Sequence, residues 1–570
     1  MSFLSPSYFA FFPVTVLIYF LLPQKCRNLW LLIGSWFFYA CAGPEYLPFL
    51  IGSSIAVYFA ARRLEKKPQK ALLVFMLALF IGLLTLFKYL GFAAGVIKSA
   101  LAVLGLDWTA AVPKLLLPAG ISFYFFAAMG YLIDVYRGKV PAEKDFVKSA
   151  LFLSFFPSLL SGPIARADRL LPQFEQRHEF SWRDVRVGLF RFAYGAFLKL
   201  LIADRLAVMV DTVFASPQSF GSLQVIAAAC AFSIQIYCDF AAYSHMAIGS
   251  ARAMGFKLTE NFNTPYFSRS VAEFWRRWHI SLSTWFRDYL YIPLGGNRRG
   301  KARKYINVLI VFAVSGLWHG AATSFLVWGL LNGIYQVIGS ITAPLRARVR
   351  NALHLEDNGK LTVLWQMLCV FVLATVAWTF FEAGSVSGAI DVLRACAGSP
   401  LWAAPLSAMG MDKWEFVVAA VSCIVMLIAD TLHFRHGDQA ERAADKPWPL
   451  RCLLLLALLA ELRQTEAGAY AQTWPDPNVS PAFSQTSAPT SFYGCPGRLR
   501  MPEPARLIGD FHRMTEVMGK VDHLGQMAVN PPKLPDPADL INTSALPDLS
   551  SMAEMLGPLL GRFGNGNTEN

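Results

Sequence analysis

The feature that most constrains this chain is a series of apolar segments, many of them long enough to enter a lipid bilayer. A perpendicular membrane helix needs about 20 apolar residues, and several of these segments are shorter. We therefore predict an all-α polytopic membrane protein with about ten to twelve membrane helices plus re-entrant or interfacial helices. The apolar segments lie near residues 8–22, 29–41, 47–60, 71–88, 115–134, 147–161, 186–203, 220–249, 305–339, 361–381, 414–432 and 449–461.

Composition agrees with a membrane protein and argues against several soluble domains. Of the 570 residues, 55% are hydrophobic and only 16% are charged. The nine cysteines are scattered without metal-binding spacing, so we predict neither a disulfide framework nor a metal site. The first apolar run lacks a basic leader and a small-residue cleavage site, and we expect it to be kept as a helix.

The net charge of +13 does not indicate nucleic acid, because the lysines and arginines lie in short loops between apolar segments. The first and third loops are basic (Lys25 and Arg27, then 62–70), whereas the second carries only Glu45. Positive loops stay in the cytoplasm. We therefore predict that the N-terminus lies outside, that the basic run 298–304 is cytoplasmic, and that the main partner is the lipid bilayer.

The composition changes after about residue 460. The region 1–460 is predicted to be the membrane domain, whereas 461–570 is rich in proline and serine and has no sustained apolar pattern. Such a sequence buries too little apolar surface to offset the entropy lost on ordering. We expect a disordered or atypical tail, and a frameshift, a gene fusion and a lineage-specific extension are all open origins.

The stretch 261–320 holds the polar residues that an apolar protein buries least easily. It passes through a helix-compatible segment with Arg276 and His279, breaks at Pro293, and ends at His319 in an apolar helix. An ionisable side chain in such a helix is costly and therefore indicates function, although a purely structural, hydrogen-bonded histidine is the alternative. His279, 40 positions earlier, favours a two-histidine centre.

Several linked motifs make this sequence resemble the membrane-bound O-acyltransferase family, most closely the branch with the membrane subunit of alginate O-acetylation. They are EFWRRWHISLSTWFRDYLYIPLGGNRRG at 273–300, SGLWHG at 315–320, PAGISFYFFAAMGYLIDVYRG at 118–138, FFPSLLSGPIARADRLLPQF at 155–174 and YCDFAAYSHMAIG at 237–249. Many motifs in order are far more specific than one. The resemblance covers about residues 1–460, and it implies a helical bundle around a tunnel.

The resemblance also implies an activity and a location. His319 is the expected catalytic residue and His279 its partner, in a multi-pass protein of the bacterial inner membrane. The implied reaction moves an acetyl group from a cytosolic thioester, acetyl-CoA or another, across the membrane for O-acetylation of an exported, alginate-like polysaccharide. No bound cofactor is implied. The implied partner is a periplasmic acetyltransferase of an exopolysaccharide modification complex.

Other polar residues are weaker candidates for binding substrate or donor. Asp239 and Tyr243 are four apart and share a helix face, so both are expected to point into the bundle. Arg276 more plausibly stabilises its segment. Arg298 and Arg299 fit the phosphates of a donor and equally fit the positive-inside rule. At Ala127 the family usually has a polar residue, which weakens the case for substrate contact by that helix.

Two functions from other classes compete with acyl transfer. A secondary transporter would use Asp239, His245 and His319 as a proton relay, but it predicts internal repeats, which the sequence does not show. A non-catalytic scaffold of an export complex would tolerate the loss of His319. Replacement of that histidine therefore discriminates acyl transfer from a scaffold.

Overall fold

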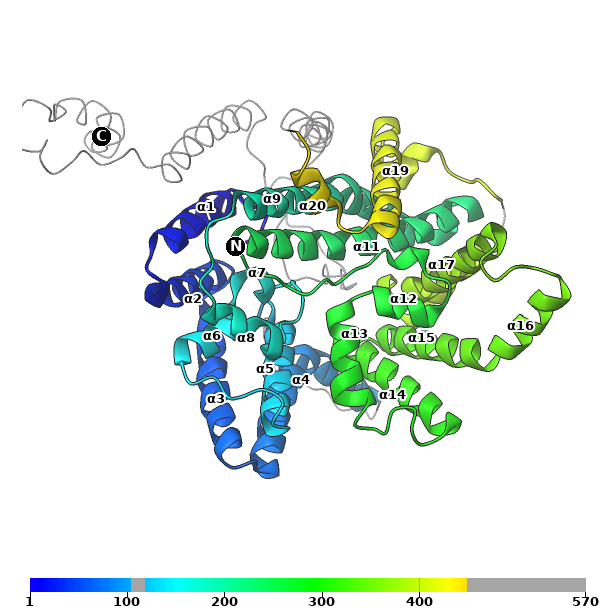
Figure 1. Cartoon of the computed structure of the whole chain (residues 1–570). Helices are drawn as coiled ribbons and strands as arrows, with labels where there is room; N and C mark the ends of the chain where they lie inside the picture. Colours follow the sequence, from blue (N-terminus) through cyan, green and yellow to red (C-terminus); the bar gives the residue numbers. More distant parts are fainter. Residues whose placement is uncertain (104–117, 399, 448–570) are drawn as a thin grey trace, which may run out of the picture. The chain divides into compact units, whose positions relative to one another are not determined.

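A computed structural model describes residues 1–103, 118–398 and 400–447, which all belong to one compact unit. Within these ranges every regular element is a helix, as predicted for an all-α membrane protein (Figure 1). The apolar segment 449–461 and the domain boundary expected near residue 460 lie outside the described residues.

The first eight α-helices run to residue 175. Ser5 caps the first of them, since its hydroxyl accepts a hydrogen bond from the Tyr8 amide at 3.3 Å. The segment predicted at 147–161 is two short helices, because the chain leaves the helical conformation at Phe155. The helices are α1 (Pro6–Leu21), α2 (Gln24–Ala40), α3 (Leu47–Lys66), α4 (Lys70–Val103), α5 (Ile121–Tyr136), α6 (Phe146–Ser154), α7 (Phe156–Leu159) and α8 (Ala167–Glu175).

The later helices include two π-helical insertions, Leu198–Ala203 and Arg287–Tyr291, which interrupt the regular helical spacing of side chains. The apolar segment predicted at 305–339 is divided after His319 into two helices. The remaining helices are α9 (Trp182–Phe197), α10 (Asp204–Ala215), α11 (Ser222–Ala253), α12 (Val271–Arg277), α13 (Ile280–Phe286), α14 (Lys301–His319), α15 (Thr323–Ile341), α16 (Ala343–Ala352), α17 (Lys360–Glu382), α18 (Val386–Cys396), α19 (Lys413–His436) and α20 (Gln439–Ala444).

Short 3-10 turns join several of these helices. They are Pro44–Tyr46, Pro217–Ser219, Pro265–Phe267 and Leu406–Met409. Among the described residues, six helices are long and apolar enough to cross a membrane: α3 with its preceding turn, α4 to Leu90, α11, α15, α17 and α19. The helices α1 and α5 are apolar but shorter. The predicted segments 29–41, 147–161 and 186–203 lie on α2, on α6 and α7, and on α9 with the π-helix after it; each of these α-helices has 17 residues or fewer.

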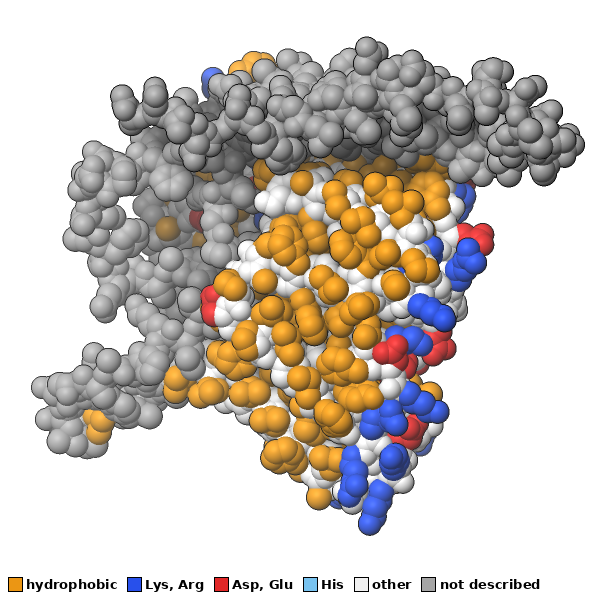
Figure 2. Space-filling view, turned by 90° about the vertical axis from the view of Figure 1, so that its left-hand side faces the viewer, with side chains coloured by type: hydrophobic (Ala, Val, Ile, Leu, Met, Phe, Trp, Pro, Cys, Tyr) orange, Lys and Arg blue, Asp and Glu red, His pale blue; other side chains and the backbone are white. Residues whose placement is uncertain are grey.

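Figure 2 shows that hydrophobic and charged side chains occupy different parts of the surface. Hydrophobic side chains cover one face, and lysines and arginines gather along one edge of it. On α1 and α2 the exposed side chains include Phe9, Leu17 and Ile33, each about half exposed or more. A soluble protein rarely exposes so continuous an apolar surface. The face is therefore suited to lipid, and the charged edge to water and headgroups.

Glycines let two helix pairs approach closely. A Cβ atom at Gly316 of α14 would lie 2.3 Å from the carbonyl oxygen of Phe325, and one at Gly329 of α15 would lie 2.3 Å from that of Phe312. Small residues at such contacts allow membrane helices to pack without a hydrophobic driving force. The pair α14 and α15 is thereby fixed around the turn that follows His319.

The pair α9 and α11 is built in the same way. A Cβ atom at Gly188 would lie 2.5 Å from the carbonyl oxygen of Gly249, and one at Gly195 would lie 2.7 Å from that of Ala242. Figure 1 shows the two helices side by side. Their contact fixes α9 along α11, which is the longest apolar helix after α4 among the described residues.

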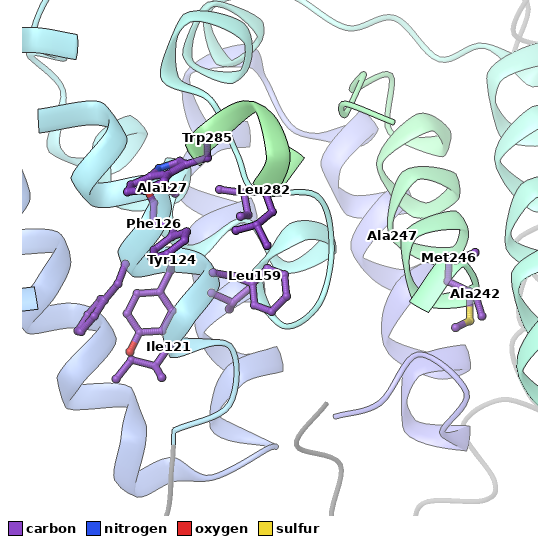
Figure 3. Packing of buried hydrophobic residues seen from close by; sticks show 14 of the residues in the cluster. Ile121, Tyr124, Phe126, Ala127, Leu159, Ala242, Met246, Ala247, Leu282 and Trp285 are labelled. Atoms are coloured by element: carbon purple, nitrogen blue, oxygen red, sulfur yellow. Dashed lines mark hydrogen bonds between the residues drawn. The ribbon is translucent and has the colours of Figure 1, made fainter. Parts of the chain in front are cut away.

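The helix α5 is buried along nearly its whole length. The ring of Phe126 stacks on that of Trp285 of α13 with centroids 4.2 Å apart, and the Trp285 indole donates a hydrogen bond to the Phe126 carbonyl at 2.8 Å (Figure 3). This contact brings α13, next to His279, against the core.

Candidate active site

His319 lies at the C-terminal end of α14, inside a group of aromatic rings. Its ring centroid is 4.7 Å from that of Trp318, 4.9 Å from that of Trp328 on α15 and 5.2 Å from that of Phe381 on α17. The chain leaves the helix at Gly320, which is extended. Trp328 is fully buried, whereas His319 keeps partial exposure. The imidazole is thus held by packing, and its Nδ1 atom is buried although the residue as a whole is partly exposed.

His279 lies deeper, at the break between α12 and α13. It is 3% exposed, and its backbone is left-handed with φ of 42°. Its ring meets Phe240 of α11 edge to face at 4.5 Å and lies 6.3 Å from the Trp318 ring. Burial lowers the pKa of His279 to about 3, so the ring is neutral at physiological pH. Both predicted histidines therefore pack against the same tryptophan.

Asn261 fixes the orientation of His279. Its side-chain oxygen accepts hydrogen bonds from the Ser281 amide at 3.3 Å and the Ser281 hydroxyl at 2.7 Å. Because the amide N–H only donates, the Asn261 oxygen must face this way, and it also meets His279 Nδ1 at 3.3 Å. Nδ1 therefore carries the proton and Nε2 is left as the acceptor. The Asn261 amide nitrogen donates to Ser244 at 3.2 Å.

The predicted residues Asp239 and Tyr243 do share a side of α11, but they meet Lys199 rather than the histidines. The Lys199 ammonium lies 2.6 Å from Asp239 and 2.8 Å from Asp204, and 5.8 Å from the centroid of the Tyr243 ring. The side of α11 that contacts the histidine region carries Phe240 instead. The π-helix that contains Lys199 places this cation against α11.

The predicted arginines lie at the surface. Arg276 is exposed at the end of α12, and Arg298 and Arg299 are exposed in the turn before α14. His319 is at the other end of that 19-residue helix. At 1.5 Å per residue the separation along the axis is about 28 Å. The structure does not bring these arginines to the histidines.

A second polar cluster fixes the segment after α13. Arg166 forms an ion pair with Asp288 at 3.1 Å, and its guanidinium lies 4.7 Å from the centroid of the Tyr289 ring. The Tyr289 hydroxyl donates to the buried carboxylate of Asp134 at 2.6 Å. Arg166 is thus engaged with Asp288, and this ion pair connects the segment after α13 to the start of α8.

His245, a relay residue in the transporter hypothesis, is a hydrogen-bonding residue near the end of α11. Its Nδ1 accepts from Arg191 Nε at 3.3 Å. The same arginine lies 3.2 Å from Asp438, just after α19, and bonds to Glu260. His245 is therefore part of an ionic cluster, and the structure does not bring it to His319.

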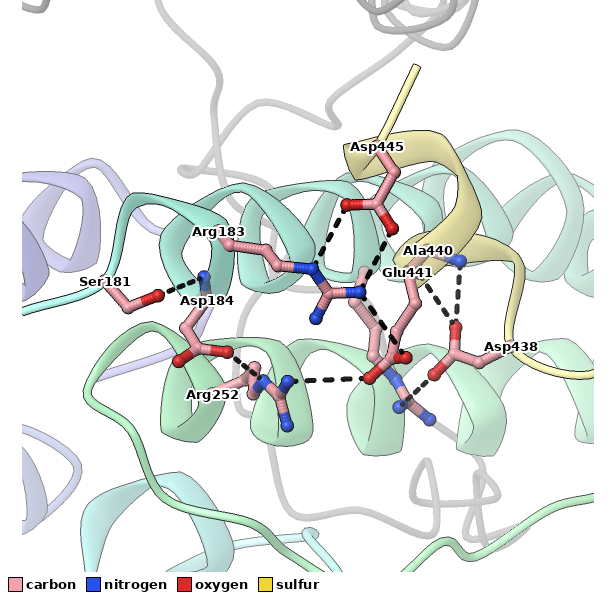
Figure 4. A network of polar contacts seen from close by, with 9 residues as sticks. Ser181, Arg183, Asp184, Arg252, Asp438, Ala440, Glu441 and Asp445 are labelled. Atoms are coloured by element: carbon pink, nitrogen blue, oxygen red, sulfur yellow. Dashed lines mark hydrogen bonds and ion pairs between the residues drawn. The ribbon is translucent and has the colours of Figure 1, made fainter.

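That cluster continues to α20 (Figure 4). Arg183 of α9 donates two hydrogen bonds to Asp445, each of 3.1 Å. Arg252 of α11 lies 2.7 Å from Asp184 and 3.5 Å from Glu441. The short helix is thus tied by charges to the ends of α9 and α11.

Two contributors to the site were missed by the sequence reasoning. No spacing signal in the sequence links Asn261 to a histidine 18 positions later. Lys88 lies in α4, with its ammonium 5.0 Å from the centroid of the Trp318 ring. A lone lysine inside an apolar segment is the signal that could have found it.

The chain was also compared with known proteins. The sequence model of the membrane-bound O-acyltransferase family matches residues 142–380. A probable alginate O-acetylase of Pseudomonas putida is 38% identical over 485 residues, covering 81% of this chain and 97% of the relative. One of Pseudomonas syringae is 36% identical, covering 77% and 84%. A peptidoglycan O-acetyltransferase of Helicobacter pylori is 34% identical, covering 68% and 78%.

Proposed function

Because this chain belongs to the membrane-bound O-acyltransferase family and is therefore an O-acyltransferase, we propose that it delivers acetyl groups for O-acetylation of an exported envelope polysaccharide. The observation that carries the proposal is the His319 imidazole, enclosed by aromatic rings beside a neutral, oriented His279. The names of the relatives support a polysaccharide acceptor, alginate or peptidoglycan in their cases.

The proposed chemistry is transfer from a thioester to a hydroxyl group. A nitrogen of His319 takes the proton as the hydroxyl oxygen attacks the thioester carbonyl. The carbon–sulfur bond then breaks, and the proton passes to the departing thiolate. A positioned base of this kind contributes on the order of 10² to 10⁴ in rate. In this scheme His279 supports His319, and its Nε2 is available as a further acceptor.

We propose that the donor is acetyl-CoA or another acyl thioester that arrives from the cytoplasm. The exposed Arg298 and Arg299, in a basic turn at the start of α14, suit the phosphates of such a donor. The donor would then enter along α14 towards His319. Asp239, Tyr243 and Arg276 are expected to act on substrate only indirectly, since the first two surround Lys199 and the third is exposed.

The proposed location is the bacterial inner membrane, with the N-terminus in the periplasm. In support, the basic loops after α1 and α3 and before α14 would then all face the cytoplasm. A hydroxyl on a periplasmic acetyltransferase is the proposed acceptor, and that partner would pass the group to the polymer. The 461–570 tail has no role in this scheme.

The contacts do not favour the proton-relay transporter. Asp239 is paired with Lys199, and His245 is bonded to Arg191, so two of the three relay residues are engaged away from His319. A non-catalytic scaffold is distinguished from an acyltransferase by the effect of replacing His319.

Replacement of His319 by alanine or glutamine tests the proposal. We expect the O-acetyl content of the envelope polysaccharide to fall by about 100-fold or more in cells with the variant as the only copy, since the base is lost. Membrane level and melting temperature in detergent should change little. His436→Ala, at the exposed last residue of α19, is the matched control and should keep normal acetylation. Normal acetylation in both His319 variants would refute the proposal and favour a scaffold.

A further inference from the structure

Lys88 is a cation placed where an apolar helix meets the proposed active site. It lies within the part of α4 that is apolar enough to cross a membrane, in a run with no other charge between residues 71 and 90. An ionisable side chain at such a position is expensive unless it has a partner, and it usually marks a function. Neither the proposed reaction nor the packing of α4 in lipid accounts for it.

The partners of Lys88 are on the last turn of α14. Its ammonium donates to the carbonyl oxygen of Trp318 and lies 5.0 Å from the centroid of the Trp318 ring. The hydroxyl of the next residue, Tyr89, bonds to the carbonyl of Leu317 and, at 3.3 Å, to that of Gly320. The last carbonyls of a helix have no partner within it. Here Lys88 and Tyr89 of α4 cap this end of α14 by bonding to the carbonyls of residues 317, 318 and 320, which lie on both sides of His319 in sequence.

The charge matters as well as the hydrogen bond. The C-terminal end of a helix carries a partial negative charge, which favours a protonated histidine there. A protonated imidazole cannot accept the proton of a hydroxyl group. The Lys88 ammonium interacts electrostatically with the His319 ring and opposes the charge of the helix end. The lysine therefore favours the neutral imidazole that the proposed reaction needs.

We propose that Lys88 is a positioning residue for acyl transfer: it caps α14 at Trp318, sets the direction of His319 and keeps that imidazole available as a base. The inference rests on the proposed role of His319. It adds that the positive charge at position 88, and not only the bulk of the side chain, is required for turnover.

The experiment measures acetyl transfer by inverted membrane vesicles, whose cytoplasmic face is outward, from cells with the variant as the only copy. Radiolabelled acetyl-CoA is supplied over a range of pH. We expect Lys88→Met to lower kcat by about 10- to 100-fold with little change in KM, as expected for a misplaced base. The acidic limb of the pH–rate profile should move upward by about 0.5 to 1 pH unit. Lys70→Met, at the start of the same helix, should behave as wild type.

Charge replacement covers the case in which Lys88→Met folds poorly. Lys88→Arg should recover at least half of the rate, and Lys88→Cys should gain activity after aminoethylation but none after methylthiolation, with wild type treated in parallel. A Lys88→Met enzyme with normal kcat and an unmoved acidic limb would overturn the inference. The inference would also be overturned if neither Lys88→Arg nor aminoethylated Lys88→Cys restored activity. Measuring His319→Ala in the same vesicles separates the two proposals, since an active His319→Ala enzyme refutes the function itself.

Discussion

The helix pairs α9–α11 and α14–α15 have similar backbone contacts along their length, but different kinds of side chain hold their ends. Both pairs rely on glycines that bring one backbone against another. The first pair ends in arginines and carboxylates that also bind α20, whereas the second ends in His319 among tryptophan and phenylalanine rings. Charges hold one end, and aromatic packing holds the other.

The difference follows from what each end must do. Ion pairs near water tolerate rearrangement, and each contributes little to stability. A reactive imidazole needs a fixed position and a neutral ring, which surrounding carboxylates would disfavour by stabilising its protonated form. Aromatic rings fix the ring of His319 without adding charge, and Lys88 is the cation that lies against Trp318.

The largest expected effect comes from disturbing the shared glycine contacts. Gly329→Ala places a methyl group 2.3 Å from a backbone oxygen, so α14 and α15 must separate. We expect a loss of about 3 kcal/mol or failure to accumulate, measured as melting temperature and yield in detergent. Gly339→Ala, on the same helix with nothing within 4 Å, is the control and should be neutral. Equal stability of the two variants would show that the backbones are not in contact.

An intermediate loss of stability is expected at the end of the α9–α11 pair that ion pairs hold. Arg191→Met removes a buried guanidinium and leaves the carboxylates of Glu260 and Asp438 without it. Since those carboxylates are partly exposed, we expect a loss of about 1 to 2 kcal/mol, smaller than for a fully buried pair. Arg442→Met, exposed on α20, should change melting temperature little. Acetyl transfer by the folded fraction of Arg191→Met should be normal, and a selective loss of turnover would mean that the two ends are coupled.

The smallest effect concerns the docking of α20. The Arg183 guanidinium lowers the pKa of Asp445, so this pair favours docking above the ordinary carboxyl pKa and ceases to do so as pH falls through the lowered pKa. Hydrogen exchange of residues 439–444, corrected for intrinsic rates, should therefore accelerate below about pH 4 in wild type. Asp445→Asn should exchange slightly faster at neutral pH and lose that acceleration. A variant with unchanged pH dependence would show that Asp445 is not the responsive group.

The helical class and the face shared by Asp239 and Tyr243 followed from the sequence, because apolar length and helical spacing are local properties. The catalytic role of the two histidines was implied by the resemblance and stays a prediction, and both rings pack against Trp318. The partners of Asp239 and Tyr243 did not follow from the sequence. Which side of α11 meets His279 depends on how α9 and its π-helix pack, and the π-helix places Lys199 against Asp239. A regular helical pattern cannot reveal an insertion that shifts its own spacing.

Long-range polar contacts were likewise beyond the sequence. Asn261 contacts His279 from a non-helical segment that precedes α12. Lys88 contacts Trp318, which lies 230 positions later in the sequence. The lysine was visible as a charge in an apolar run, but its partner was not, since only the fold brings α4 to the end of α14. Similarly, the aromatic rings around His319 come from three helices whose registers the sequence does not reveal.

The backbone of His279 has a consequence for any replacement at that position. With φ of 42°, it occupies a region that glycine enters freely, asparagine and aspartate enter fairly often, and β-branched residues almost never. A valine or isoleucine there would distort the junction of α12 and α13 before the loss of the imidazole could be felt. Asparagine and glycine are consequently the substitutions that report on the ring alone, and library designs at this junction are limited to a handful of amino acids.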